Sequence, residues 1–280
     1  EVMPDELELF KYPHDVVRHH MNRCASAVDH RITARPDDYR EMADGVFVAT
    51  RGGDVTIGDH TVFDTSDGPV IFEAGVRVGP MSFFRGPVYV GAGSKFTEHS
   101  SVKDGVSIGH TCKIGGEVEG VIVEPYSNKQ HHGFLGHSYL GSWINLGAGT
   151  CNSDLKNTYG TVNMTYGSRK VSTEMQFMGC VMGDYAKTAI NTSIFTGKWI
   201  GAGSMMYGFV TANVPSFVND ARSLGQIGRV PPAVIVTMQK RMFARRGIMQ
   251  RPCDIQLIHD MFQLTAADRP TGLSDDPLAL

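Results

Sequence analysis

A six-residue repeat of large apolar side chains constrains the fold of this chain more than any other feature. An α-helix completes about 1.67 turns in six residues, so this period would spread the apolar side chains around the whole helix. A short strand followed by a corner suits the period, and three such units close one triangular coil of 18 residues. The sequence therefore predicts an all-β solenoid of parallel strands. Eight consecutive sixth positions are Val, Ile or Phe: Phe72, Val78, Phe84, Val90, Phe96, Val102, Ile108 and Ile114.

The glycine content supports this interpretation. Glycine accounts for 32 of the 280 residues, above the usual value of roughly 7%. It directly follows the large apolar residue at Gly79, Gly91, Gly109 and Gly115. Glycine at this position is typical of a tight corner.

A second register of sixth positions follows a break. We interpret the 20 residues from Ile114 to Phe134 as one coil with a two-residue insertion. We interpret the 36 residues from Leu146 to Met182 as two coils, interrupted by a protruding polar loop at about 151–170. This loop shows no core residues, so we expect a neighbouring coil to hold it. The positions of the second register are Phe134, Leu140, Leu146, Met182, Thr188, Ile194, Ile200 and Met206.

Helical patterns flank the repeat, at 13–30 and, after a pair of prolines, at about 233–246 with a third helix behind it. Helices here would cover the open strand edges of the solenoid. The basic helix at 233–246 has either a solvated face or a contact for the phosphates of a nucleotide. The expected parts are an N-terminal helical cap and linker at 1–50, a solenoid domain at 51–213 and a C-terminal helical extension at 214–280.

Composition excludes several classes of protein. The net charge is −3, so no basic surplus favours nucleic acid. No apolar stretch approaches the roughly 20 residues of a membrane span, and the acidic N-terminus does not look like a secretory signal. The five cysteines are widely spaced and form no C-x-x-C, which favours a reducing compartment and hence the cytoplasm. The chain lacks an initiator Met, so we expect a trimmed protein or a piece of a longer one.

Polar side chains concentrate between Tyr126 and Tyr159, in a repeat otherwise made of small residues. His137 lies beside Gly136 at a position of the hexad that faces outward. An isolated histidine on a sheet is more often structural than catalytic, but these neighbours favour function. Imidazole titrates near neutral pH, so His137 is the candidate general base.

The strings G-H-S-Y-L-G, I-N-L-G-A-G-T and N-S-D-L-K-N within this segment carry a family resemblance. They resemble the acetyltransferase half of bifunctional uridyltransferase/glucosamine-1-phosphate acetyltransferases, in a variant form with S-N-K-Q-H and N-S-D-L-K-N-T-Y-G. The resemblance covers about Gly68 to Val210. It implies a left-handed parallel β-helix and a homotrimer with active sites between subunits. It further implies acetyl transfer from acetyl-CoA to the amine of an amino-sugar phosphate, glucosamine-1-phosphate, in UDP-N-acetylglucosamine synthesis.

The resemblance also implies roles for individual residues, with His137 as the base. No Gly-rich nucleotide-binding loop of the uridyltransferase half is present, so uridyl transfer is not expected of this chain. The implied substrate-binding residues are Arg85 and Lys129 for the phosphate, Tyr139, Asn145 for the sugar, and Lys156, which would reach a neighbouring subunit's site. The implied acetyl-CoA-binding residues are Ala148, Asn152 and Ala202.

Two other interpretations use the same residues. His132 and His137 are spaced like metal ligands, and His110 is a third candidate, as in hexapeptide-repeat carbonic anhydrases that bind zinc with three histidines at subunit interfaces. The acetyltransferase interpretation includes no metal. The third interpretation is a non-catalytic trimeric scaffold or binding module.

Overall fold

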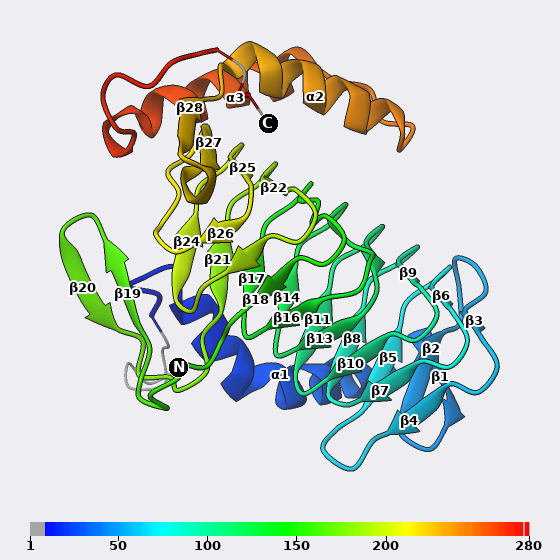
Figure 1. Ribbon diagram of the computed structural model, residues 1–280. Coiled ribbons are helices and arrows are strands. Elements are labelled where there is room, and N and C mark those ends of the chain that lie inside the picture. Colours follow the sequence, from blue (N-terminus) through cyan, green and yellow to red (C-terminus); the bar gives the residue numbers. More distant parts are fainter. Residues whose placement is uncertain (1–8, 277, 280) are drawn as a thin grey trace.

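The computed structural model describes residues 9–276, 278 and 279, which form a solenoid of stacked triangular coils (Figure 1). Each coil contributes a short strand to each of three parallel faces, which we call A, B and C. The predicted parallel β-solenoid is confirmed. The acidic segment 1–8 of the expected N-terminal flank, and residues 277 and 280 of the C-terminal extension, lie outside the described residues.

The faces are built from strands of successive coils. Face A comprises β2 (Val46–Ala49), β5 (Val70–Phe72), β8 (Val88–Val90), β11 (Val106–Ile108), β14 (Ile122–Val123), β17 (Tyr139–Leu140), β21 (Cys180–Met182) and β24 (Lys198–Ile200), with β1 (Tyr39–Ala43) antiparallel to β2. Face B comprises β3 (Thr56–Ile57), β6 (Arg77–Val78), β9 (Lys95–Phe96), β12 (Lys113–Ile114), β15 (Asn128–Lys129), a bridge at Asn145, β22 (Lys187–Thr188), β25 (Met205–Met206), β27 (Val218–Ala221) and the antiparallel β28 (Gln226–Arg229). Face C comprises β4 (Val62–Asp64), β7 (Phe83–Arg85), β10 (Ser101–Lys103), β13 (Glu117–Glu119), β16 (Phe134–Gly136), β18 (Cys151–Asn152), β23 (Ser193–Ile194) and β26 (Phe209–Val210).

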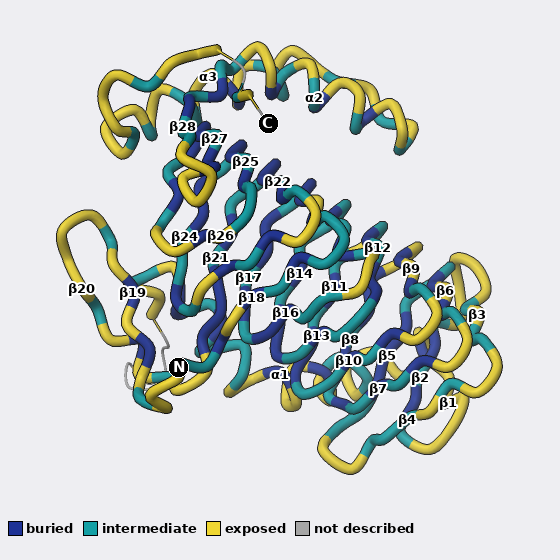
Figure 2. The backbone as a smooth tube through the Cα atoms, viewed as in Figure 1, coloured by how far each residue is buried: buried dark blue, intermediate teal, exposed yellow. Residues whose placement is uncertain are grey.

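The core is the inside of the triangle (Figure 2). All eight residues of the first predicted register point inward, and each is at most 5% exposed. The rings of Phe72, Phe84 and Phe96 pack edge to face, with centroids 5.1–5.2 Å apart. Burial of these side chains stabilises each coil on its neighbours.

The second register begins at the wrong residue. Leu135, not Phe134, is the inward residue of β16, because Leu135 pairs with the buried Val118 and is 1% exposed. Both side chains are large and apolar, so composition does not distinguish them. The expected two-residue insertion is in fact a shortening, since paired inward residues are 15 apart at Ile114 and Lys129. The register is regained at Leu140, which is buried as predicted.

The protruding loop covers 153–178 and not 151–170, because Cys151 and Asn152 form β18 on face C. The stretch from Leu146 to Met182 is therefore two sides of one coil plus an insertion. The insertion contains an antiparallel hairpin of β19 (Asn163–Tyr166) and β20 (Arg169–Ser172), which projects from the coils in Figure 1.

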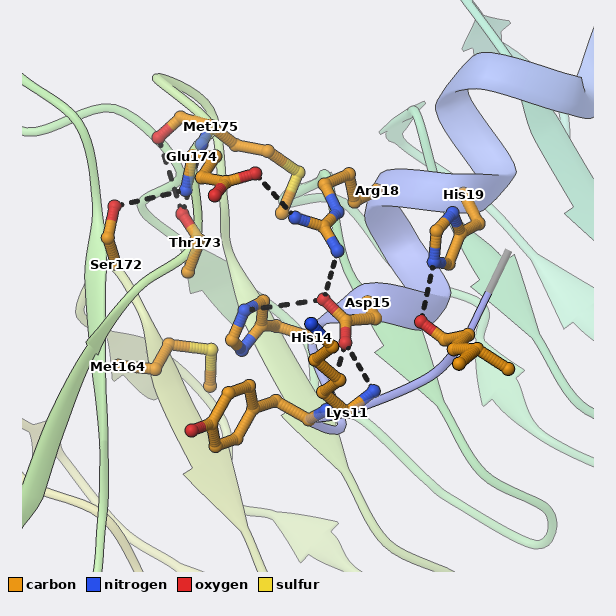
Figure 3. A network of polar contacts seen from close by, with 12 residues as sticks. Lys11, His14, Asp15, Arg18, His19, Met164, Ser172, Thr173, Glu174 and Met175 are labelled. Atoms are coloured by element: carbon orange, nitrogen blue, oxygen red, sulfur yellow. Dashed lines mark hydrogen bonds and ion pairs between the residues drawn. The ribbon is translucent and has the colours of Figure 1, made fainter. Parts of the chain in front are cut away.

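The insertion is held by the N-terminal segment of the same chain (Figure 3). The ring Nδ1 of His14 lies 2.8 Å from the hydroxyl of Tyr166. Arg18 forms an ion pair of 2.7 Å with Glu174. The expectation that the loop has no core residues was wrong. Its apolar side chains Val162, Met164 and Met178 are buried against Val17.

The helices pack on two different faces. Helix α1 (Asp15–Ala34), followed by the 3-10 turn η2 (Pro36–Asp38), lies along face A, where Cys24 and Val28 bury Ile71. The C-terminal helices α2 (Pro232–Ala244) and α3 (Pro252–Leu264) lie over the end of face B (Figure 1). Among the described helices, none combines the length and apolar character that a membrane crossing requires. The remaining 3-10 turns are η3 (Arg222–Leu224) and η4 (Ala266–Asp268).

Aromatic side chains at the A–B corner explain where the C-terminal helices dock. The left-handed corner residues of successive upper coils are Tyr126, Trp143, Tyr185, Gly203 and Phe217, with φ between 59° and 66°, and all except Gly203 are aromatic. Helices α2 and α3 bury this row with apolar side chains, among them Ile235, Phe243 and Ile258. Large aromatic surfaces at otherwise small corners give the helices a hydrophobic platform.

Candidate functional site

His137 lies at the C–A corner, between β16 and β17, and pairs with a carboxylate from the coil above. Its Nδ1 is 2.8 Å from Oδ2 of Asp154, and both side chains are 12% exposed. A carboxylate only accepts hydrogen bonds, so Nδ1 carries the proton and Nε2 holds the lone pair of the neutral ring. The pair can therefore accept a proton at Nε2 while Asp154 fixes the orientation of the ring.

The insertion supplies both neighbours of the imidazole. Asp154 lies near its start, and Phe177 near its end stacks on the ring of His137, with ring centroids 5.2 Å apart. Gly120 lies beneath the ring with φ +60°, and a Cβ there would come within 3.1 Å of Nε2 and of the Met21 sulfur on α1. The His137 ring can therefore occupy the C–A corner only because Gly120 has no side chain.

Asn152 lies inside the coil and hydrogen-bonds the backbone next to His137. It is buried at the inward position of β18, where its amide accepts from the Gly136 N–H at 2.8 Å and donates to the Gly136 carbonyl at 2.9 Å. The same amide donates to Ser138 Oγ at 3.3 Å. These contacts fix the two residues that flank His137. The structure therefore gives Asn152 a positioning role, whereas the sequence predicted direct contact with acetyl-CoA.

A row of charged side chains on face C leads up to His137. Arg85, Lys103, Glu119 and Gly136 are successive partners across β7, β10, β13 and β16. Neighbouring strands of a face are about 4.8 Å apart, and we call each strand one rung. Lys103 is therefore one rung closer to His137 than Arg85 is. The sequence pattern did not single out Lys103, although it follows Arg85 by one coil of 18 residues, which is a usable signal.

Both cations of this row are paired with acids. Arg85 Nε donates to Asp104 at 2.6 Å, and Lys103 lies 3.0 Å from Glu117 and 3.4 Å from Glu119. These hydrogen-bonded acids raise the pKa of both Arg85 and Lys103. The side chains are partly exposed, so an incoming anion can compete with their carboxylates.

Lys129 does not fit the phosphate-binding role. It occupies the inward position of β15 and is 2% exposed. Its ammonium donates to the carbonyls of Gly115 at 2.7 Å and His131 at 2.6 Å. Burial lowers the pKa of this ammonium to about 8. A side chain with this placement is part of the core, so the prediction for Lys129 is corrected.

Two of the other predicted residues lie on separate surfaces. Tyr139 is on face A, where its hydroxyl donates to Glu124 at 3.4 Å, and burial raises its pKa to about 12. Lys156 is in the insertion, where its ammonium donates to the carbonyl of Thr161. Lys156 also lines an open hollow of about 560 Å³ beside β18 and β23, so it stays near the Asp154 end of the site.

Three further residues, which the resemblance implies at sites shared between subunits, lie at separate places on this chain. Asn145 lies on face B, where it pairs with Asn128 and Lys187, away from the C–A corner. Ala148 follows at the B–C corner, whereas Ala202 lies at the A–B corner. The G-A-G triplet recurs because each coil repeats one kind of turn at several corners. Ala148 and Ala202 therefore do not line a single slot of this chain.

The three histidines of the zinc interpretation lie at three different corners. His110 packs edge-on against Tyr126 at the A–B corner, and His132 is at the B–C corner beneath Gly149. In the described part of the chain, no three His, Cys, Asp or Glu side chains come together as metal ligands. The zinc interpretation thus lacks a ligand set within this chain.

Several known proteins are similar to parts of this chain, although no family model matches it. The bifunctional protein GlmU of Ralstonia pickettii is 31% identical over 120 residues, 39% of this chain and 25% of the relative. GlmU of Alkalilimnicola ehrlichii is 31% identical over 160 residues, 49% of this chain and 31% of the relative. A bifunctional sugar-1-phosphate nucleotidylyltransferase/acetyltransferase of Sulfurisphaera tokodaii is 32% identical over 98 residues, 34% of this chain and 24% of the relative.

Solved structures with related shapes include a putative acetyltransferase of Bacillus cereus, with a TM-score of 0.38, 13% identity, and coverage of 74% of this chain and 98% of that chain. A UDP-N-acetylglucosamine acyltransferase of Francisella novicida has a TM-score of 0.33 and 12% identity, and the match covers 78% of this chain and 87% of that one. The chain spans between 24% and 31% of the length of the three curated relatives named above. The sequence matches and the solenoid of hexapeptide repeats together confirm that this chain is similar to the acetyltransferase half of GlmU-like bifunctional proteins.

Proposed function

We propose that this chain is an acetyl-CoA-dependent N-acetyltransferase that acts on an amino-sugar phosphate, with glucosamine-1-phosphate as the acceptor, in UDP-N-acetylglucosamine synthesis. The observation that carries the proposal is the His137–Asp154 pair at the C–A corner. The similarity to GlmU-like proteins supports the substrate class. The proposal covers acetyl transfer alone and not uridyl transfer. The five free cysteines are in keeping with a cytoplasmic reaction.

The reaction needs a base because an ammonium group is not a nucleophile. The acceptor ammonium first loses one proton to solvent, and His137 Nε2 takes a second proton from the amine as the amine nitrogen attacks the thioester carbon. The new N–C bond forms, the C–S bond breaks, and the proton passes from the imidazolium to the leaving thiolate of CoA. Asp154 stabilises the imidazolium by its hydrogen bond to Nδ1. Lys103 and Arg85 are the cations that would hold the phosphate of the acceptor.

The proposal includes a homotrimer whose subunits complete each other's sites. Three large apolar side chains on the upper part of face C and its B–C corner support this assembly, since Ile190, Phe195 and Phe209 are each at least 47% exposed. Exposed apolar patches of this kind are typical of interaction surfaces. Light scattering on the purified protein tests it, and a monomer at assay concentration would contradict it.

The decisive experiment is a thiol-release assay with acetyl-CoA and glucosamine-1-phosphate. We expect His137→Ala to lower the rate on the order of 100-fold or more, because general-base catalysis contributes that much. His110→Ala is the matched control, since His110 lies at the A–B corner, away from His137 and from the proposed subunit interface, and should retain activity. Release that is equal in wild type and His137→Ala, or absent with every amino-sugar phosphate, would contradict the proposal and favour a binding role.

A further inference from the structure

A second cavity lies on the opposite side of the solenoid from His137. It has a volume of about 280 Å³ and lies between face B and the C-terminal end of α2. We propose that this cavity binds a phosphorylated small molecule through its phosphoryl oxygens. The inference does not depend on acetyl transfer, because no residue of the His137 corner lines the cavity. Its polar lining consists of Lys113, Asn128, Asn145, Lys187, Arg245 and Arg246.

The cavity concentrates positive charge in a chain whose net charge is −3. Four of its lining residues are Lys or Arg, and no carboxylate lines it. Arg77, Lys95 and Lys113 are also successive partners on face B, so three cations follow one another at rungs about 4.8 Å apart. Like charges on adjacent strands are destabilising. A bound anion would offset this repulsion.

The two lysines of the cavity are held in surroundings that disfavour their charge. Burial and the nearby Arg246, Lys95 and Arg245 lower the pKa of Lys113. Burial lowers the pKa of Lys187 to about 7, and its ammonium donates to backbone carbonyls, including that of Tyr185 at 3.1 Å. A dianionic phosphate beside these groups would favour their charged forms.

The donors are held in place and aimed from separate elements. Arg246 Nη2 donates to Asn128 Oδ1 at 2.9 Å, which fixes the guanidinium against β15. Asn128 in turn donates to Asn145 Oδ1 at 3.4 Å, and this leaves the amide N–H groups of Asn145 for a ligand. Phosphate accepts hydrogen bonds and donates few, so a set of charged and amide donors matches it.

The walls set the size and kind of the ligand. Tyr126 and Trp143 stack with their ring centroids 4.2 Å apart and form an aromatic side of the cavity. Met238 and Met242 of α2 close the other side. A polymer such as nucleic acid does not fit between a helix and a sheet in this volume. A small organic phosphate does, with its phosphoryl oxygens on the cations and its organic part on the rings.

Titration calorimetry at about 50 mM salt tests the proposal. The probes are pyrophosphate, CoA, dephospho-CoA and glucosamine-1-phosphate, each added to the whole chain. We expect saturable binding of at least one probe, and at least ~10-fold weaker binding in Lys113→Gln and in Arg246→Gln, because a hydrogen bond to a charged group contributes that much. Lys95→Gln is the matched control. It removes a cation of the same row that does not line the cavity, so we expect less than ~3-fold change.

The relative affinities of the probes identify which class of phosphorylated ligand the cavity binds. Pyrophosphate binding alone would identify an inorganic polyanion, a preference for CoA over dephospho-CoA would identify its 3′-phosphate, and tighter glucosamine-1-phosphate would identify a sugar phosphate. Each supports the cavity as a phosphate site. No saturable binding of any probe, or equal losses in all three variants, would overturn it. His137→Ala should bind the probe like wild type, so a failed acetyltransferase assay leaves this result interpretable.

Discussion

The lower coils, from Phe72 to Ile114, differ from the upper coils, from Val118 to Met206, in what their inward positions hold. Every inward position that the lower register predicts is Val, Ile or Phe. In the upper coils three inward positions are polar, at Lys129, Asn152 and Thr188, and the coil length varies. Both the His137 corner and the cavity under α2 lie in or beside the upper coils. The lower coils keep the repeat without a polar residue at any of these predicted inward positions. Both candidate sites lie where the upper coils depart from the repeat.

The polar inward residues are tolerated because each is hydrogen-bonded. Asn152 bonds to both backbone groups of Gly136, and Thr188 Oγ1 accepts from the Gly147 N–H at 2.9 Å. A buried polar group without such partners costs free energy. The bonds of Asn152 also fix the corner that carries His137. In this solenoid, a substitution that breaks the hexad can therefore position a functional residue.

The largest expected effect tests where the upper register begins. Leu135→Ala removes a 1%-exposed side chain from the core and should lower the free energy of unfolding by about 2–5 kcal/mol. Phe134→Ala, the adjacent residue, is half-buried on the outside of face C and should cost less than ~1.5 kcal/mol. Urea unfolding of both variants measures the difference. Equal losses, or a larger loss at Phe134, would contradict the register.

A buried lysine gives the next largest effect, and it depends on pH. The pKa of Lys129 is about 8 in the folded protein, against the ordinary value of 10.5 that a solvated lysine has in the unfolded chain. Between these values the unfolded chain holds a proton that the folded protein has lost, so folded stability rises with pH. The stability of wild type relative to Lys129→Met should thus increase by about 3 kcal/mol from pH 8 to 10.5. Parallel profiles from chemical denaturation would show that Lys129 is not buried in the core.

The sequence could predict the lower coils because one period explains all eight of their inward residues. It could not place Phe134 and Leu135, since two adjacent large apolar residues satisfy the same pattern one position apart. His137 could be singled out as the candidate base because an imidazole stands out among small residues. Its partner Asp154 lies 17 residues away, and only the stacking of coils brings the two together.

Two of the site predictions meet the same obstacle. Lys129 was a candidate cation for the phosphate, and the resemblance implied that Asn152 contacts acetyl-CoA, but both side chains are buried at inward positions. Ala148 and Ala202 stay predictions, because the resemblance places them at a slot shared between subunits. A sequence shows how often a corner motif recurs but not on which corner it falls once coils are shortened. The cavity under α2 combines face B with a helix about 100 residues later, and no local pattern reports that contact.

The site itself should respond to loss of the carboxylate charge. Asp154→Asn can keep a hydrogen bond to Nδ1 but cannot neutralise an imidazolium, so kcat should fall on the order of 10–100-fold. The KM for the acceptor should change less than kcat, because Asp154 touches the imidazole and not the acceptor phosphate. Glu174→Gln is the control, since this acid lies in the same insertion and pairs with Arg18. If Asp154 has only a structural role, Asp154→Asn would lower stability and leave kcat of the folded protein unchanged.

The smallest expected effect comes from two glycine-to-alanine substitutions. Comparing them separates backbone strain from crowding against the His137 ring at the C–A corner. Gly120 and Gly167 have φ of +60° and +59°, so alanine at either position costs about 1 kcal/mol in strain. A Cβ at Gly167 meets nothing within 4 Å, whereas one at Gly120 comes within 3.1 Å of the His137 ring, which Asp154 holds in place. Gly120→Ala should therefore lose about 1 kcal/mol more than Gly167→Ala, and several-fold more activity. Thermal unfolding and the thiol-release assay on both variants measure this, and equal behaviour of the two would mean that the imidazole does not rest on Gly120. Because the strain is common to both variants, whatever difference remains reports how tightly the short upper coil fits around the base.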